Sequence, residues 1–118
     1  MDRRYFPVHF FVTETGNEPV REWLRNLTAQ ERKMIGEDIK TVQFGWPLGM
    51  PLIKKLEPGL WEVRSKLVNK ISRVIFTVID EHIILLHGFI KKSQALPKED
   101  LHLARQRLGD IKRGINEK

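Results

Sequence analysis

The chain has 118 residues, of which 41% are hydrophobic and 31% charged, and it contains no cysteine. This composition argues against an intrinsically disordered chain, and the lack of cysteine excludes disulfides, thiolate catalysis and cysteine-based zinc sites. The length predicts a single domain over residues 1–118. Because disulfides belong to oxidising compartments, a chain without cysteine also favours the cytoplasm.

The net charge of +6 lies entirely in the second half of the sequence. Residues 1–53 hold seven basic and seven acidic side chains, residues 54–92 hold eight against four, and residues 93–118 hold six against four. A localised basic surface favours an anionic partner, with nucleic acid ahead of a membrane because no strongly apolar amphipathic helix accompanies it. The apolar run Tyr5–Val12 is too short for a membrane span and lacks a small-residue cleavage site, so we expect no signal peptide.

The spacing of apolar residues predicts four strands and three helices. A strand is expected over residues 5–12, and helices are expected over residues 19–27 and 28–45, the second begun by a Thr28–Glu31 capping box. The segment 46–59 is rich in proline and glycine and predicts a loop that contains Lys54 and Lys55. Strands over residues 60–67, 71–79 and 82–90 and a helix over residues 97–114 complete the chain.

Consecutive strands joined by short turns favour an antiparallel meander whose apolar face is covered by helices, which is an α+β fold. The two adjacent N-terminal helices also suggest a helix-turn-helix motif. The second helix carries Glu31, Glu37 and Asp38, however, and a recognition helix should be more basic. A helical hairpin packed on the sheet is therefore favoured. On the strand 60–67, Glu62, Arg64 and Lys66 are expected to face outward.

Common catalytic motifs are missing from the sequence. There is no phosphate-binding loop, dinucleotide fingerprint, H-E-x-x-H zinc motif or nucleophile elbow. His9, His82, His87 and His102 lie on different predicted elements, and none forms a helical i, i+4 pair. We therefore expect no metal site and no cofactor.

Basic residues gather instead on the predicted strands and at their ends: Lys54, Lys55, Arg64, Lys66, Lys70, Arg73, Lys91 and Lys92. In an antiparallel hairpin the start of one strand lies beside the end of its neighbour, so Arg73 should lie near Lys91 and Lys92. Guanidinium groups bind phosphate in a bidentate manner, and lysines add point charges. Such groups can stabilise the extra charge of a pentacoordinate phosphate without a metal ion.

His87 has two interpretations. It shares strand parity with Ile83, Leu85 and Phe89, which favours a hydrogen-bonded core histidine. Its neighbour Gly88 leaves room for a backbone or a ligand to approach, and a histidine can act as an acid or a base near neutral pH. Both interpretations stay open at this point.

Three sequence stretches resemble a known family. KKLEPGLWEVRSKL, SRVIFTVI and IILLHGFIKKSQALPKEDLHLARQR are similar to the phage-type branch of the HigB toxins in the RelE/ParE toxin superfamily, and the V-x-x-W-L-x-x-L pattern of Val20–Leu27 also fits. The resemblance implies a RelE-like fold, a small antiparallel-rich sheet with two N-terminal helices packed on it and a C-terminal helix. It implies a toxin of a type II toxin–antitoxin pair that cuts mRNA on translating ribosomes without a metal ion, through attack by the RNA 2′-hydroxyl. It also implies a cognate helix-turn-helix antitoxin as partner.

The resemblance assigns roles to individual residues. Arg64 matches the cation of the first active-site strand, Arg73 the central arginine, and Lys91 or Lys92 the cation after the last strand. On this basis we expect Arg64, Arg73, His87, Lys91 and Lys92 to be catalytic. We expect the RNA-binding residues to be Lys54, Lys55, Lys66, Lys70, Ser93 and Gln94.

The chain departs from the family pattern at two positions. The tyrosine of RelE-like enzymes falls near Leu101 here, and the lysine two residues before the first-strand cation is Glu62. The proton-transferring group must therefore be sought among His87, His102 and Glu62. Two other functions stay open, namely a ParE-like toxin that inhibits a protein such as gyrase, and a basic nucleic-acid-binding module without catalysis.

Overall fold

The computed structural model describes residues 5–47, 52–91 and 97–117, which form a five-stranded sheet and three helices. In chain order the elements are β1 (Val8–Phe10), α1 (Pro19–Arg25), α2 (Ala29–Gly45), β2 (Ile53–Glu57), β3 (Leu60–Leu67), β4 (Lys70–Ile79), β5 (His82–Lys91) and α3 (Lys98–Glu117). This arrangement confirms the predicted α+β class and is broadly consistent with a RelE-like fold.

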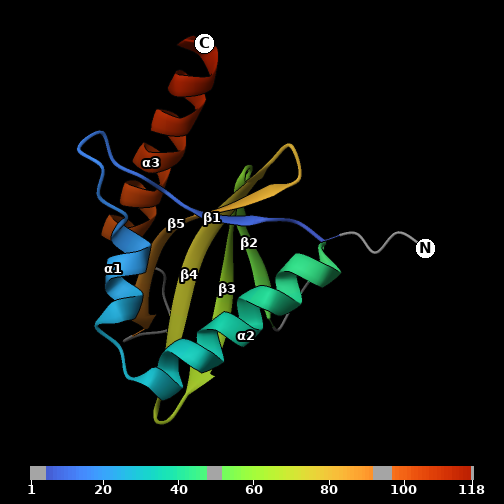
Figure 1. Ribbon diagram of the computed structural model, residues 1–118, viewed down its shortest axis with the longest axis vertical. Helices are drawn as coiled ribbons and strands as arrows, with labels where there is room; N and C mark the ends of the chain where they lie inside the picture. Colours follow the sequence, from blue (N-terminus) through green and yellow to red (C-terminus); the bar gives the residue numbers. More distant parts are fainter. Residues whose placement is uncertain (1–4, 48–51, 92–96, 118) are drawn as a thin grey trace.

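The strands lie in the order β1-β5-β4-β3-β2, so β4 occupies the centre of the sheet (Figure 1). The strands β3 to β5 form the predicted antiparallel meander, β2 extends it beyond β3, and β1 joins it as a parallel edge strand beside β5. Asp80 and Glu81 have φ values of 50° and 65° in the turn between β4 and β5. Two consecutive residues with positive φ suit a tight hairpin turn, because their backbone twist matches that of the strands.

Two predicted segments differ from the structure. The N-terminal strand is confined to Val8–Phe10, and the predicted loop 46–59 contains strand β2. Ile53 of β2 is buried opposite Val63, and the chain turns back at Pro58 and Gly59, the latter with a φ of 85°. Pro58 follows the strand directly and removes no hydrogen bond from the ladder, so it is compatible with β2.

Helices cover both faces of the sheet. The first apolar cluster joins Val20 of α1 and Ile35 and Ile39 of α2 to inward side chains of the strands, such as Val74 and Phe76. This packing confirms the helical hairpin rather than a free recognition helix, and the Thr28–Glu31 capping box that starts α2 is present. Figure 1 shows α2 crossing the strands obliquely.

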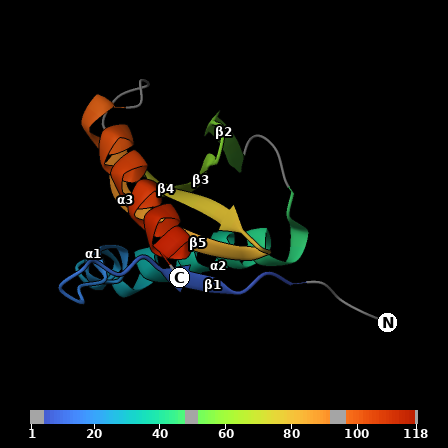
Figure 2. The same ribbon diagram turned by 90° about the horizontal axis from the view of Figure 1, so that it is seen from above.

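Helix α3 packs on the other face. Figure 2 shows α3 on the opposite side of the sheet from α1 and α2. Ala104 and Leu108 belong to the second apolar cluster together with Leu60, Ile75 and Leu86. Arg105 on α3 donates three hydrogen bonds of 2.7–3.1 Å to the carboxylate of Glu57 on β2. These contacts confirm the prediction that the C-terminal helix covers the sheet. Within the described ranges, no helix is long and apolar enough to cross a membrane.

Trp23 of α1 occupies the space beside Gly88 of β5. A Cβ atom added to Gly88 would lie 2.4 Å from Cε3 of Trp23. Glycine is therefore required at this position by close packing of a helix on the sheet. Gly88 makes room for an indole ring of the protein itself, and this removes the argument that it opens the strand to a ligand.

Gly88→Ala is expected to lower the free energy of unfolding by about 1–3 kcal/mol, because the new methyl group overpacks the contact with Trp23. Chemical denaturation measures the effect. Gly36→Ala, at an open position of α2 where no atom lies within 4 Å, is the matched control and should be neutral or stabilising. If Trp23→Leu does not relieve the loss in the double variant, the assigned contact is wrong.

Candidate functional site

The predicted site residues converge around Arg73, near the start of the central strand β4. Arg64 of β3 lies directly opposite Arg73, and Phe89 lies opposite it on β5. Residues two positions further along the neighbouring strands are diagonal neighbours on the same face, within about 7–8 Å. Arg73 therefore has Glu62 and Lys66 as diagonal neighbours on β3, and on β5 it has Lys91, opposite Ile71.

Arg73 and Glu62 form a buried ion pair at the centre of the site. Their side chains are 4% and 0% exposed, and Nε of Arg73 lies 3.6 Å from Oε2 of Glu62. Within residues 5–47, 52–91 and 97–117, neither carboxylate oxygen of Glu62 has a hydrogen-bond partner. The prediction that Glu62 faces outward on an exposed strand face is wrong, because α3 and the neighbouring strands cover this part of the sheet.

Lys91 lies in the positive electrostatic potential of the neighbouring basic side chains. Removal from water lowers the pKa of its ammonium group below the usual 10.5. The positive charges of Arg73, Arg64 and Lys54 lower that pKa further, against the opposing attraction of Glu62. The predicted proximity of Arg73 and Lys91 is thus confirmed. We call Lys54, Arg64, Arg73 and Lys91 the cationic cluster.

The other predicted lysines divide between the two faces of the sheet. Lys54 of β2 lies opposite Glu62 of β3 in the strand register. Lys55 lies over the ring of Trp61, with Nζ 6.0 Å from the ring centroid, on the face that α2 covers. Lys66 is exposed on the face of the cationic cluster. Lys70 pairs with Glu31 at the start of α2, with Nζ 2.7 Å from Oε2.

The structure therefore separates Lys55 and Lys70 from the cluster, because adjacent strand residues point to opposite faces. Lys92, Ser93 and Gln94 lie outside the described residues.

His87 lies on the face of the cationic cluster and not among the core residues of its strand. A β-bulge between β4 and β5 places His87 opposite Ile75 and Leu85 opposite Phe76, with Leu86 as the extra residue. Because an inserted residue reverses the alternation of side chains, Leu85 packs under α2 while His87 points toward α3. The parity argument for a core histidine is therefore wrong.

Asp100, in the first turn of α3, holds the His87 ring. Nε2 of His87 lies 2.5 Å from Oδ1 of Asp100, and the ring stacks on Phe89 with centroids 5.5 Å apart. An ionised carboxylate accepts hydrogen bonds only, so the neutral ring that suits this contact is the tautomer with the proton on Nε2, in which Nδ1 is an acceptor. A neutral imidazole held in this way can take up a proton at Nδ1.

The other two candidates for proton transfer are placed less favourably. His102 is exposed on α3 beside Lys98 and Arg105, and Glu62 is fully buried against Arg73. Leu101, at the position of the expected tyrosine, packs against the second apolar cluster. Of the three candidates, His87 alone combines partial exposure with a hydrogen-bonded partner that orients its ring.

The chain matches the family model of the phage derived protein Gp49-like (DUF891) over residues 22–109, which is more than half of its length. The chain belongs to this family. Gp49-like proteins are associated with RelE/HigB-type toxins, so the broad prediction of a toxin-like phage-derived protein is supported. A search of the curated proteins gave no match.

The matched segment of this Gp49-like protein contains the whole cationic cluster, His87 and Asp100, and it excludes β1 and the end of α3. Within the described ranges, no group of three or more His, Asp or Glu side chains is placed to hold a metal ion.

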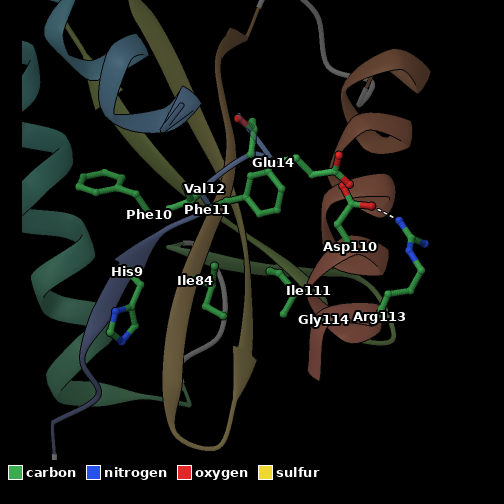
Figure 3. A pocket seen from close by; sticks show the side chains of 11 residues that line it. His9, Phe10, Phe11, Val12, Glu14, Ile84, Asp110, Ile111, Arg113 and Gly114 are labelled. Atoms are coloured by element: carbon green, nitrogen blue, oxygen red, sulfur yellow. Dashed lines mark hydrogen bonds and ion pairs between the residues drawn. The ribbon is translucent and has the colours of Figure 1, made fainter. Parts of the chain in front are cut away.

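A cavity of about 440 Å³ lies elsewhere in this Gp49-like protein, between the end of β1 and the C-terminal half of α3 (Figure 3). Phe11 and Ile84 form its apolar part, and Glu14, Asp110 and Arg113 carry its charges. Arg113 is already paired with Asp110, so this cavity offers no comparable site for an anion.

Sequence reasoning missed Asp100 because it lies on a different predicted element from His87. Its position in the first turn of a helix whose N-terminus follows the strand of His87 was the available signal. An acidic side chain near a helix N-terminus also has an ordinary structural role, because it interacts favourably with the helix dipole. The position of Asp100 therefore did not by itself indicate a functional residue.

Proposed function

We propose that this Gp49-like protein is a toxin of the RelE/HigB type that cleaves mRNA on the ribosome without a metal ion. The observation that carries the proposal is the convergence of Lys54, Arg64, Arg73 and Lys91 on one face of the sheet, with one buried carboxylate among them. The four cations outnumber the carboxylate of Glu62, so this face of strands β2 to β5 carries a net positive charge. Such a surface suits a phosphate group of RNA.

Arg64 and Lys91 are the groups we assign to the scissile phosphate. Both are partly exposed, whereas Arg73 is only 3% exposed beneath them. As the RNA 2′-oxygen attacks, negative charge grows on the phosphate oxygens, and preorganised cations stabilise that charge. Arg73 acts as a positioning residue, since its charge neutralises Glu62 and maintains the positive potential of the cluster.

Proton transfer is assigned to His87 and Lys91. Nδ1 of His87 takes the proton of the attacking 2′-hydroxyl while Asp100 holds Nε2. The bond between phosphorus and the 2′-oxygen forms, the bond to the 5′-oxygen breaks, and Lys91 gives a proton to the departing 5′-oxygen. The products are a 2′,3′-cyclic phosphate and a 5′-hydroxyl. A lysine whose pKa is lowered is a better proton donor than an ordinary one.

The rate of RNA cleavage should decline as the pH rises into the alkaline range. This decline should begin at a lower pH than it would if Lys91 had the pKa of an ordinary lysine. The protonated form of Lys91 is the active one, and its pKa lies below 10.5, so raising the pH removes the donor earlier. Cleavage of mRNA on programmed ribosomes, followed as kcat/KM from neutral to alkaline pH, measures this decline. In Lys91→Arg, which keeps the charge but does not release a proton, the rate should be lower and this decline should disappear.

Lys66→Arg is the control, because Lys66 lies on the same face without an assigned proton transfer. An unchanged alkaline decline in Lys91→Arg would contradict the role of Lys91 as the acid.

The proposed function is tested by brief induction of the toxin followed by primer-extension mapping of cellular transcripts. We expect discrete cuts within translated messages and products that carry a 2′,3′-cyclic phosphate. Growth arrest with intact messages and a DNA-damage response would instead indicate inhibition of a protein such as gyrase. Salt-dependent RNA binding without any product would indicate a binding module. We further propose that a helix-turn-helix antitoxin neutralises the toxin, and its co-expression should restore growth.

A further inference from the structure

A second cavity adjoins the cationic cluster at the edge of the sheet. It has a volume of about 450 Å³ and lies between α2, the start of β2 and the hairpin of β3 and β4. Arg64 belongs both to its wall and to the cationic cluster. A molecule bound in this cavity would therefore lie next to the phosphate site.

The cavity has two walls of opposite charge. Glu37 and Asp38 of α2 form the acidic wall, and Arg64 and Lys66 of β3 form the basic wall. Within the part of the chain that the structure describes, none of these four side chains forms an ion pair or a side-chain hydrogen bond. The two walls are thus available to a ligand that carries an anion at one end and hydrogen-bond donors at the other.

Apolar side chains complete the lining of the cavity. Met34, Leu52 and Ile71 are half-buried and belong to α2, the residue before β2 and the start of β4. A flat aromatic ring can pack against such side chains, and thioether sulfur atoms make favourable contacts with rings. A nucleotide combines a phosphate, a flat base and a polar base edge, and the lining contains basic, apolar and acidic side chains that suit these three parts.

We propose that this cavity binds the base next to the scissile phosphate and selects bases that carry an amino group on their pairing edge, guanine above all. The inference rests on the proposed function and specifies its substrate. Guanine presents N1–H and the N2 amino group side by side, so that one carboxylate accepts from both. Uracil presents a single N–H flanked by two carbonyl oxygens, which carboxylates repel. Glu37 and Asp38 therefore determine the preference.

Mononucleotide titrations test the cavity without any cleavage. The protein with methyl-labelled methionine is titrated with GMP and with UMP, and the signal of Met34 reports binding. GMP should bind roughly 5- to 150-fold more tightly than UMP, the range expected for a bidentate base contact. In Glu37→Gln/Asp38→Asn, whose amides add donors opposite the donors of guanine, this ratio should approach one.

Glu14→Gln is the matched control, because Glu14 is an exposed carboxylate that lines the other cavity. It should leave the ratio unchanged. Equal affinities in the native protein, or a ratio that survives in the double variant, would overturn the inference. Glu37→Gln alone, at an exposed position, provides the same test should the double variant fold poorly.

Transcript mapping separates this inference from the proposed function. The native toxin should cut preferentially beside amino-bearing bases, and this preference should be relaxed in the double variant. Unaltered cut sites in the double variant would refute the base cavity and leave the nuclease intact. Absence of any cutting by the native toxin would refute the nuclease, while the GMP and UMP titrations would still decide whether the cavity selects bases.

Discussion

Arg73→Ala is expected to abolish RNA cleavage and to lower the free energy of unfolding by about 3–5 kcal/mol, the cost of leaving a buried charge without its partner. The alanine would remove the counter-charge of Glu62, whose side chain is fully buried. An uncompensated carboxylate would also lie beneath the phosphate and repel it. Chemical denaturation and cleavage assays measure the two effects separately.

The burial of the ion pair is the reason why a loss of stability is expected together with the loss of activity. Arg73→Gln/Glu62→Gln removes both charges and should recover much of the stability, because no charge is left unpaired. If Arg73→Ala is as stable as the native protein, the ion pair contributes nothing and its assigned role is wrong. Full activity of Arg73→Ala would overturn the site itself.

Arg64→Ala is expected to slow cleavage by about 100- to 1,000-fold, the loss found when one donor to a developing anion is removed. Arg64 is partly exposed and forms no ion pair within the described ranges, so the variant should keep its stability. Rates of cleavage at saturating and limiting RNA separate a lost binding contact from lost stabilisation of the transition state. A drop in kcat as well as in kcat/KM is expected.

Lys55→Ala is the matched control for loss of positive charge near the site. Lys55 follows Lys54 in the chain but points to the opposite face, over Trp61. It should cleave RNA at close to the native rate. If Lys55→Ala and Arg64→Ala slow the reaction equally, net charge accounts for the effect and the placement of Arg64 does not.

Local patterns were sufficient for most of the secondary structure. The spacing of apolar residues predicted α2, whose buried side chains are Ile35, Ile39 and Val42, and the Thr28–Glu31 capping box predicted its start. β2 was missed because the prolines and glycines that flank Ile53–Glu57 indicate a loop when read locally. Its hairpin pairing with β3 satisfies the backbone of these residues, and the propensities of single residues do not reveal this pairing.

The sequence by itself determined that Arg64, Arg73 and Lys91 would meet, since an antiparallel meander with short turns places them on neighbouring strands. It could not determine the surroundings of His87 and Glu62. One bulged residue reverses the face of His87, and only the packing of α3 brings Asp100 to its ring and buries Glu62 beside Arg73. Strand alternation is a local rule, whereas burial and partners depend on segments that are distant in the chain.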